Sequence, residues 1–293
     1  MPSRCEHAKI GLKRKRHKLY DLLKKLPPRS IVLDVGCGQG SFHYETCAGT
    51  IVAMDLAVQE TSLRKSDLHV AHMCGDAAAI PLSNGSVDAV ISHHTMEHFV
   101  DYKAALSEIA RVLRPDGWLW VAVPNGYGFD DNLYRFVFSG GGHVNRFSRD
   151  GLVAEIQHAT GMDLVAQCDL FSSFIYLKKP SPEELKHYPP KARFLAEVPD
   201  GFSVFGTLGI NAATRIVDKL LGSRCSQYGW GFIFSKNALD TFHLPSYFNV
   251  CRKCGSGNSF ASTARRTVFG FGLFHCIYCK TLNICVAPPK DLD

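Results

Sequence analysis

The chain has 293 residues, of which 46% are hydrophobic and 20% are charged. This composition is ordinary for a soluble globular protein and allows a sizeable core, in one large domain or one domain with an appendage. The formal net charge of +6 is mildly basic. No run of about 18 apolar residues is present, which excludes a transmembrane helix.

The basic N-terminus lacks the apolar stretch of a signal peptide. Much of the excess charge lies within residues 9–25, a basic surface that can attract phosphate, although a solvated helix packed on the domain is the favoured interpretation. The 11 cysteines comprise two Cys-x-x-Cys pairs and seven scattered residues. Scattered cysteines without a signal peptide favour a reducing, cytoplasmic location and no disulfides.

Apolar strands and helices are expected to alternate along most of the chain. Residues 9–26 are expected to form a helix that ends at Pro27 and Pro28. The other expected helices begin at Ser41 or span residues 101–113 and 148–159. The expected strands are residues 30–35, 50–55, 68–73, 87–92, 118–123, 164–170 and 231–235. This alternation predicts an α/β fold whose parallel sheet carries helices on both faces.

Two segments interrupt this pattern. Residues 171–227 are proline-rich and are expected to form an irregular insertion with one helix near residues 211–221. Residues 125–142 are aromatic and glycine-rich and are a candidate lid. The aromatic side chains of both segments favour an apolar or aromatic ligand, or they simply pack the insertion. The sequence shows no internal repeat and no low-complexity tract.

A glycine-rich loop follows the first expected strand. Gly36, Gly38 and Gly40 let the backbone turn sharply and approach a ligand closely. Asp55 ends the second strand, nineteen residues after Gly36, where a carboxylate accepts hydrogen bonds from ribose hydroxyls. Asp76 follows the third strand and can accept from an exocyclic amine such as that of adenine. Ligands of open parallel sheets bind outside these carboxyl ends.

A dinucleotide site would share the glycine loop, but two residues disagree with it. Ser41 stands where a dinucleotide fingerprint requires glycine or alanine. Asp34 precedes the loop, where its negative charge opposes a pyrophosphate. That charge instead suits the cationic end of a sulfonium amino acid.

Several motifs in order resemble those of the class I, type 11 small-molecule methyltransferases. The resemblance covers roughly residues 30–170 and the strand at 231–235, and it implies a Rossmann-like sheet with a terminal antiparallel strand. It also implies S-adenosylmethionine at the strand ends and a substrate covered by the variable parts. The motifs are Asp34-Val-Gly-Cys-Gly-Gln-Gly40, Met54-Asp55, Gly75-Asp76-Ala77-Ala-Ala-Ile-Pro81, Val87-Asp88, Met96-Glu97-His98, Leu113-Arg-Pro-Asp-Gly117 and His143-Val-Asn-Arg-Phe-Ser148.

The resemblance implies a role for each matching position. The glycine loop would line the methionine and ribose portions of the donor, and Asp34 would hold its amino group. The second and third strand ends would bind ribose and adenine, and the fourth strand end would touch the methionine portion. The cofactor-binding residues expected in this way are Asp34, Gly36, Cys37, Gly38, Gly40, Asp55, Leu56, Asp76, Ala77, Ser92 and His93.

Methyl transfer from a sulfonium depends on placement of the acceptor, and a general base helps when the acceptor is a hydroxyl. Of the five candidates near the expected site, His94 and His143 are preferred as the base; the others are His93, Glu97 and His98. No Asn-Pro-Pro-Tyr type motif follows the fourth strand. Its absence counts against methylation of exocyclic nucleobase amines and favours an oxygen or carbon acceptor.

A second module is expected at the C-terminus. Cys251, Cys254, Cys276 and Cys279 form two Cys-x-x-Cys pairs separated by twenty-one residues. Four thiolates in tetrahedral geometry select zinc, and such a closed site is structural. A zinc ribbon with one zinc per chain is therefore predicted, with residues 267–275 as one strand; a redox role is the alternative. The basic residues around it suit a nucleic-acid face or an interaction tab: Arg252, Lys253, Arg265, Arg266 and Lys280.

The expected domains are a basic N-terminal helix (1–28), a methyltransferase domain (29–245) and a zinc-ribbon module (246–293). The leading functional hypothesis is an S-adenosylmethionine-dependent methyltransferase that methylates oxygen or carbon of an apolar or aromatic small molecule. One alternative is an RNA methyltransferase that uses the basic helix and the ribbon to bind RNA. Another is a non-catalytic cofactor-fold interaction module. The sequence leaves the acceptor and the oligomeric state open.

Overall fold

The computed structural model describes residues 23–38, 40–57, 69–171, 174–237, 244–259, 265–268 and 270–286. The helix expected over residues 9–26 lies largely outside the described residues. Only its end is seen, as the 3-10 helix η2 (Leu23–Lys25).

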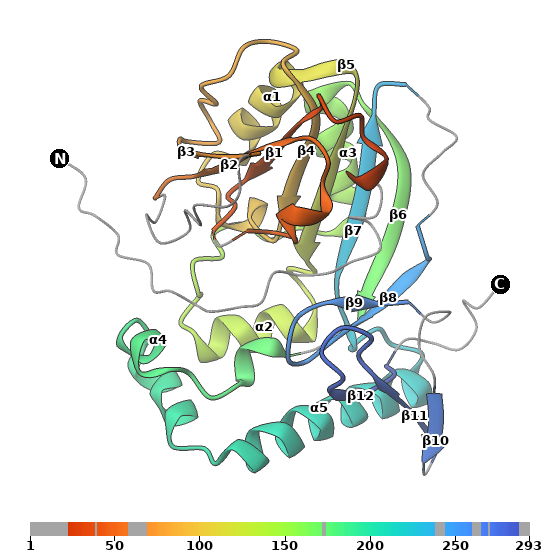
Figure 1. Cartoon of the computed structure of the whole chain (residues 1–293). Helices are drawn as coiled ribbons and strands as arrows, with labels where there is room; N and C mark the ends of the chain where they lie inside the picture. The colour runs from red at the N-terminus through yellow and green to blue at the C-terminus, as the bar shows by residue number, and fades with distance from the viewer. Residues whose placement is uncertain are drawn as a thin grey trace.

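One large mixed sheet forms the body of the protein (Figure 1). Its order is β3-β2-β1-β4-β5-β7-β6-β8-β9 in the described part of the chain. Strands β1 to β5 are parallel to one another, whereas β7 is antiparallel to both of its neighbours, β5 and β6. This arrangement confirms the predicted α/β sheet and its antiparallel strand. The strands are β1 (Ile31–Val35), β2 (Thr50–Asp55), β3 (Val70–Cys74), β4 (Val87–His93), β5 (Leu113–Pro124), β6 (Asp163–Phe171), β7 (Gln227–Ser235), β8 (Tyr247–Val250) and β9 (Gly257–Asn258).

Helices α1 (Tyr102–Val112) and α3 (Arg149–Thr160) pack side by side on one face of the sheet. Asp101 begins α1 by accepting a hydrogen bond from the Ala104 amide at 2.9 Å, as an N-cap does. The apolar stripe of α1 then buries Leu106 and Ile109 against the strands. Both helices were expected from the spacing of their apolar residues.

The opposite face is covered differently in the part of the chain that the structure describes. A 3-10 helix, η3 (Tyr44–Thr46), stands where a helix was expected from Ser41. The reason is local: the Gly40 amide bonds the Cys37 carbonyl at 2.6 Å, and Asp34 accepts hydrogen bonds from both Ser41 and Tyr44. These bonds hold the chain against the sheet, where the Tyr44 side chain is buried with Trp120 and Phe248.

Residues between β6 and β7 form the expected insertion, and they are more helical than predicted. They contain η6 (Ile175–Leu177), α4 (Pro182–Lys186), η7 (Pro190–Ala196) and α5 (Asp200–Leu221). Helix α5 starts well before residue 211, although three glycines in its first half lower helix propensity. No described helix combines the length and apolar character that a membrane span requires.

The carboxyl ends of β4 and β5 point toward α2 (Phe129–Val137), with the insertion beyond it (Figure 1). A small core of Val137 from α2 with Ala192 and Leu195 from η7 joins the two. The expected lid at residues 125–142 is therefore a short helix followed by a glycine turn, packed on the insertion.

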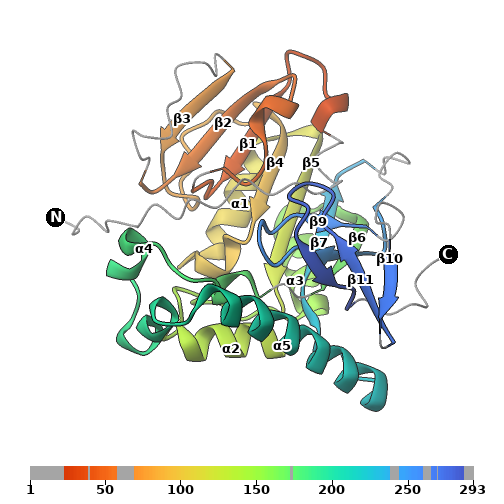
Figure 2. The ribbon, with the colours of Figure 1, turned by 60° about the horizontal axis from the view of Figure 1, so that its bottom comes forward.

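The C-terminal residues form a three-stranded sheet beside α5 (Figure 2). Residues 267–275, expected as one strand, are instead part of a hairpin. Gly270 has a φ of +79°, which suits a turn and not a continuous strand. The first strands of this region, β8 and β9, extend the large sheet, and Tyr247 packs on Phe171 and Val286. The small-sheet strands are β10 (Arg265–Val268), β11 (Phe271–His275) and β12 (Leu282–Ile284).

Candidate active site

The glycine loop after β1 is held by its own backbone. The Cys37 amide donates to the Met54 carbonyl at 2.9 Å, which ties the loop to β2, and the Cys37 side chain is buried. Gly36, Gly38 and Gly40 all have positive φ, at +64°, +50° and +102°. A Cβ added at Gly38 would meet no atom within 4 Å, so this part of the loop faces open space. The loop therefore offers exposed backbone at the carboxyl edge of the sheet.

Thr95, which sequence reasoning missed, packs against the start of this loop. A Cβ at Gly36 would lie 2.9 Å from both Cβ and Cγ2 of Thr95. The Thr95 hydroxyl contacts the Val35 carbonyl at 3.3 Å. Only glycine leaves room for this contact, because real Cβ atoms essentially never approach so closely.

Gly36→Ala is expected to lower the free energy of unfolding by about 2–4 kcal/mol, from backbone strain at positive φ plus overpacking against Thr95. Gly38→Ala is the matched control: its φ is also positive, but its Cβ meets nothing, so about 1–2 kcal/mol is expected. Urea unfolding of both variants measures the difference. Equal losses would show that Thr95 moves aside freely.

Asp34 is buried, and its carboxylate is committed to the loop. Oδ1 accepts from the Ser41 hydroxyl at 2.6 Å, and Oδ2 accepts from the Ser41 amide at 3.0 Å and the Tyr44 hydroxyl at 2.6 Å. Burial raises the pKa of the Asp34 carboxyl, while these hydrogen bonds oppose the rise. The geometry gives Asp34 a role in fixing the loop and offers no support for its expected contact with the amino group of the donor.

Asp55 and Asp76 lie at neighbouring strand ends, because β2 and β3 pair in register up to Asp55 and Cys74. Oδ2 of Asp55 accepts from the Gly38 amide at 2.8 Å, so the acid and the glycine loop are in contact. Asp76 is exposed and accepts from the Ala78 amide at 2.9 Å, while the neighbouring Ala77 is buried. Leu56 is 71% exposed, which is unusual for leucine.

This donor set fits an adenosine group. Carboxylates accept hydrogen bonds from hydroxyls and amines, an exposed leucine offers an apolar surface to a base, and glycine backbone permits close approach. The residues that would hold S-adenosylmethionine here are Gly38, Asp55, Leu56 and Asp76.

Two of the expected cofactor residues point into the interior. The Ser92 side chain is fully buried, and its hydroxyl lies 2.9 Å from that of Thr95. The His93 ring is buried against Trp120, whose indole N–H donates to Nδ1 of His93 at 3.2 Å. Alternation along β4 sends successive side chains to opposite faces, so these residues support the strand end from within.

His94 projects at the end of β4 from a strained backbone, with a φ of +54°. Its ring stacks on Tyr228 with centroids 5.5 Å apart, and its Nε2 lies 3.2 Å from the Tyr228 hydroxyl. Its Nδ1 lies 3.6 Å from a carboxylate oxygen of Glu97. Strained residues of this kind cluster at functional sites, which motivates a role for His94. Tyr228 was missed because the last strand was expected to begin only at Gly231.

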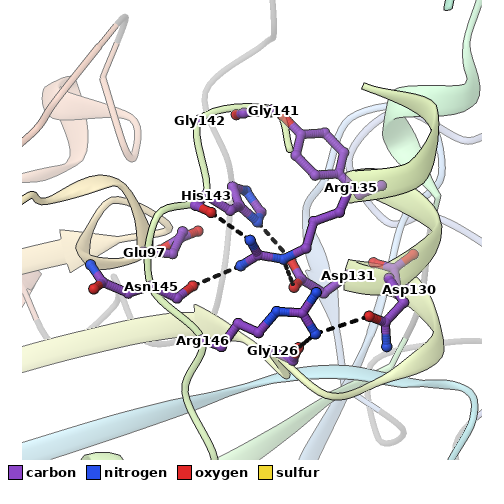
Figure 3. Close-up of polar contacts among 12 residues, drawn as sticks. Glu97, Gly126, Asp130, Asp131, Arg135, Gly141, Gly142, His143, Asn145 and Arg146 are labelled. Carbon is purple, nitrogen blue, oxygen red and sulfur yellow. Dashed lines mark hydrogen bonds and ion pairs between the residues drawn. The ribbon is translucent and has the colours of Figure 1, made fainter. Parts of the chain in front are cut away.

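His143 is held by α2. Its Nδ1 lies 2.6 Å from Oδ1 of Asp131, and Arg135 pairs with the other oxygen of that carboxylate (Figure 3). Burial alone raises the pKa of the Asp131 carboxyl, but the hydrogen bonds from His143 and Arg135 outweigh it, so this pKa lies below its ordinary value. Arg135 also donates to the His143 and Asn145 carbonyls. An ionised carboxylate thus orients the imidazole.

The loop that carries His143 is tied to the short helix η5 (Met96–His98). The amides of Val144 and Asn145 both donate to the Glu97 carbonyl, at 2.9 Å and 3.0 Å. His98 Nδ1 lies 2.9 Å from the Gly142 carbonyl. The structure therefore brings His94, Glu97, His98 and His143 together, all of which the sequence singled out.

Aromatic residues of α2 and the insertion pack on one another beside this cluster. Tyr134 contacts Tyr176 with ring centroids 5.2 Å apart, and Phe138 contacts Tyr188 at 5.1 Å. The Tyr176 hydroxyl donates to Oδ1 of the buried Asp130 at 2.9 Å, and burial raises the pKa of Asp130 to about 7. These aromatics pack the insertion, whereas Phe202 and Phe205 on α5 are exposed.

The four C-terminal cysteines form one cluster. The Sγ atoms of Cys251 and Cys279 are 3.6 Å apart, those of Cys254 and Cys276 are 3.7 Å apart, and all four lie within 4.8 Å of one another. These separations exclude disulfides, whose sulfurs lie about 2 Å apart. Three of the four cysteines are buried.

The two turns that carry the cysteines are built alike, which corrects the expectation of no internal repeat. Residues 251–258 and 276–283 share the pattern Cys-x-x-Cys-x-Ser/Thr-x-Asn. Each asparagine reaches across to the other turn. The Asn258 side chain accepts from the Ile277 amide at 3.0 Å, and the Asn283 side chain accepts from the Arg252 amide at 3.0 Å. Aligning the two cysteine pairs would have revealed both asparagines.

Comparisons with known proteins find similarity over part of the chain. Residues 33–121 match a family described as a methyltransferase domain. A probable S-adenosylmethionine-dependent methyltransferase of Mycobacterium tuberculosis (strain ATCC 25618 / H37Rv) is 32% identical over 169 residues, 54% of this chain and 58% of that protein. The tRNA (carboxymethyluridine(34)-5-O)-methyltransferase of Macaca fascicularis is 37% identical over 102 residues, 34% of this chain and 15% of that protein. The malonyl-[acyl-carrier protein] O-methyltransferase of Yersinia pestis is 38% identical over 90 residues, 30% of this chain and 34% of that protein.

The chain thus spans between 15% and 58% of the length of these relatives. Among solved structures, a Haemonchus contortus N-methyltransferase with phosphomonomethylethanolamine and S-adenosylhomocysteine aligns with a TM-score of 0.50. The alignment is 19% identical and covers 74% of this chain and 51% of that one. At this identity the likeness concerns the fold.

Proposed function

Residues 33–121 belong to a methyltransferase domain family, and from this premise we propose that the chain is a class I S-adenosylmethionine-dependent methyltransferase that methylates an oxygen atom of its acceptor. The observation that carries the choice of oxygen is His94, which lies between the Glu97 carboxylate and the Tyr228 hydroxyl at the end of β4. A hydroxyl acceptor needs a group to take its proton, and an imidazole suits that task. Two relatives named above are also O-methyltransferases.

S-adenosylmethionine, when bound, supplies a methyl group on a cationic sulfur. A lone pair of the acceptor oxygen forms the new bond to the methyl carbon. Gly38, Asp55, Leu56 and Asp76 would hold the donor, and the electron pair of the broken carbon–sulfur bond would remain on its sulfur. The proton of the acceptor passes to Nε2 of His94, where Tyr228 can share it. Asp131 holds the His143 ring close to Glu97 and His98.

We infer that the acceptor is a small molecule with apolar or aromatic character. The aromatic cluster of α2 and the insertion lies beside His143, with the Tyr134 and His143 rings 4.5 Å apart. Tyr134, Phe138 and Tyr176 pack on one another but are each only partly buried, so their rings keep an apolar surface for a partner.

RNA is the second candidate acceptor. One relative acts on tRNA, and exposed cationic side chains of Lys253, Arg266 and Lys280 lie around the cysteine cluster. Phosphate contacts of such residues would make RNA binding strongly dependent on salt.

Turnover of radiolabelled S-adenosylmethionine with cell extract, with and without ribonuclease treatment, tests the proposal. We expect label in a fraction that is soluble in organic solvent and insensitive to ribonuclease. Label that disappears with ribonuclease would show that the acceptor is RNA and not a small molecule. No transfer of label to any fraction would contradict methyl transfer.

We also propose that the four cysteines hold one structural zinc. Zinc–thiolate bonds are about 2.3 Å long, so a tetrahedral site separates its sulfurs by about 3.8 Å. The closest pairs, at 3.6 Å and 3.7 Å, match that spacing. All four positions are filled by thiolates, and such a closed site leaves none for a substrate.

A further inference from the structure

We propose that Glu97, His98 and His143 bind a divalent transition-metal ion on the acceptor side of the site. One ligand atom from each residue lies within 4.8 Å of those of the other two. A single ion at about 2.0–2.2 Å from nitrogen and oxygen donors spans such a group after small side-chain rotations. Two of these residues are partly or fully buried, so the cluster is not a set of solvated surface charges.

The hydrogen bonds of both histidines leave the same nitrogen for a ligand. Nδ1 of His98 faces the Gly142 carbonyl at 2.9 Å, and Nδ1 of His143 faces the Asp131 carboxylate at 2.6 Å. Carbonyl and carboxylate oxygens only accept, so each Nδ1 carries a hydrogen and each Nε2 carries a lone pair. Metal-binding histidines almost always donate their second nitrogen to such oxygens. The two rings stand 4.8 Å apart at 77°, as neighbouring ligands of one ion can.

The backbone holds the three donors in place. Glu97 and His98 lie on η5, and the loop with His143 is fixed to η5 by the two amides that donate to the Glu97 carbonyl. Arg135 clamps the loop from the other side through the His143 and Asn145 carbonyls, as Figure 3 shows. The donors are therefore placed before any ion binds, which lowers the entropic cost of binding.

Two imidazoles and one carboxylate favour a first-row divalent ion such as manganese, iron, cobalt or zinc, with open positions for other ligands. The thiolate cluster has a different preference, for zinc. If the proposed function holds, an open position on the ion takes the acceptor oxygen. His143 then serves as a ligand, and His94 alone takes the proton.

Titration of the full-length chain, loaded with only one equivalent of zinc for the cysteine cluster, with Mn²⁺ tests the site through the electron paramagnetic resonance signal of free Mn²⁺. We expect about one Mn²⁺ per chain. His143→Ala and Glu97→Gln should each weaken binding by more than about 100-fold, and Asp131→Asn by about 10–100-fold through loss of His143 orientation. His158→Ala removes an exposed histidine of α3 and should bind Mn²⁺ like the wild type.

Absence of Mn²⁺ binding by the folded wild type would overturn the site, as would wild-type affinity in His143→Ala and Glu97→Gln together. Circular dichroism establishes that each variant is folded. Mn²⁺ binding with no methyl transfer to any acceptor would overturn the proposed function and leave the metal site standing. Methyl transfer that persists in full in His143→Ala would overturn the role of the ion.

Discussion

Asp55→Ala is expected to lower the affinity for S-adenosylmethionine by about 100-fold or more. Hydrogen bonds to a charged group contribute about 1.5–3 kcal/mol each, and ribose offers two hydroxyls to this carboxylate. The variant also removes the acceptor of the Gly38 amide, which would loosen the loop that is proposed to contact adenosine. Isothermal titration calorimetry of wild type and variant measures the change.

Asp116→Ala is the matched control, because Asp116 is an exposed acid within the long strand β5, outside the candidate site. Its affinity should equal that of the wild type. Asp55→Asn keeps an oxygen for the Gly38 amide and should lie between the two. If Asp55→Ala binds S-adenosylmethionine within two-fold of the wild type, the ribose contact is wrongly assigned.

Cys276→Ser is expected to abolish zinc binding and to lower the thermal unfolding midpoint by about 10 °C or more. Structural zinc supplies roughly 10–16 kcal/mol in small peptides, and a loss of several kcal/mol shifts a domain of this size by that amount. The effect should be large because the cysteine turns have little core beyond Tyr278 and the thiols themselves. Elemental analysis and differential scanning calorimetry measure the two changes.

Cys285→Ser provides the control within the same module, since Cys285 follows β12 and lies outside the four-cysteine cluster. It should retain one zinc per chain. Freshly purified, reduced wild-type protein without zinc would contradict the assignment. So would a Cys276→Ser variant that unfolds at the wild-type temperature.

The parallel sheet was predictable because its strands are short apolar runs that end in acids or glycines. Buried strands need such runs whatever their neighbours, so β2 was expected with its observed bounds, residues 50–55. Helix α1 was likewise visible from its 3.6-residue period. Only the second half of helix α5 was predicted, because glycines interrupt the apolar pattern of its first half.

The sequence predicted where most residues of the candidate site lie in the fold, but not which neighbours their side chains contact. The sequence placed Asp34 and Ser92 at strand ends but gave no sign that their side chains would bond Ser41 and Thr95. Which way a strand-end side chain points depends on the neighbours that approach it in three dimensions. Asp131 was missed for the same reason, since nothing in the sequence pairs it with His143. Tyr228 was missed because the last strand was expected to begin only at Gly231.

The pairing of β8 with β6 has a consequence for solubility. Without β8, strand β6 would end the sheet with a row of unpaired backbone groups, a template on which another molecule could add a strand. β8 covers this edge, and the outermost strand beyond it, β9, has only two residues. Because β8 runs directly into Cys251, the turns that carry the four cysteines hold β8 in place. We therefore expect the C-terminal strands to protect the edge of the large sheet against aggregation.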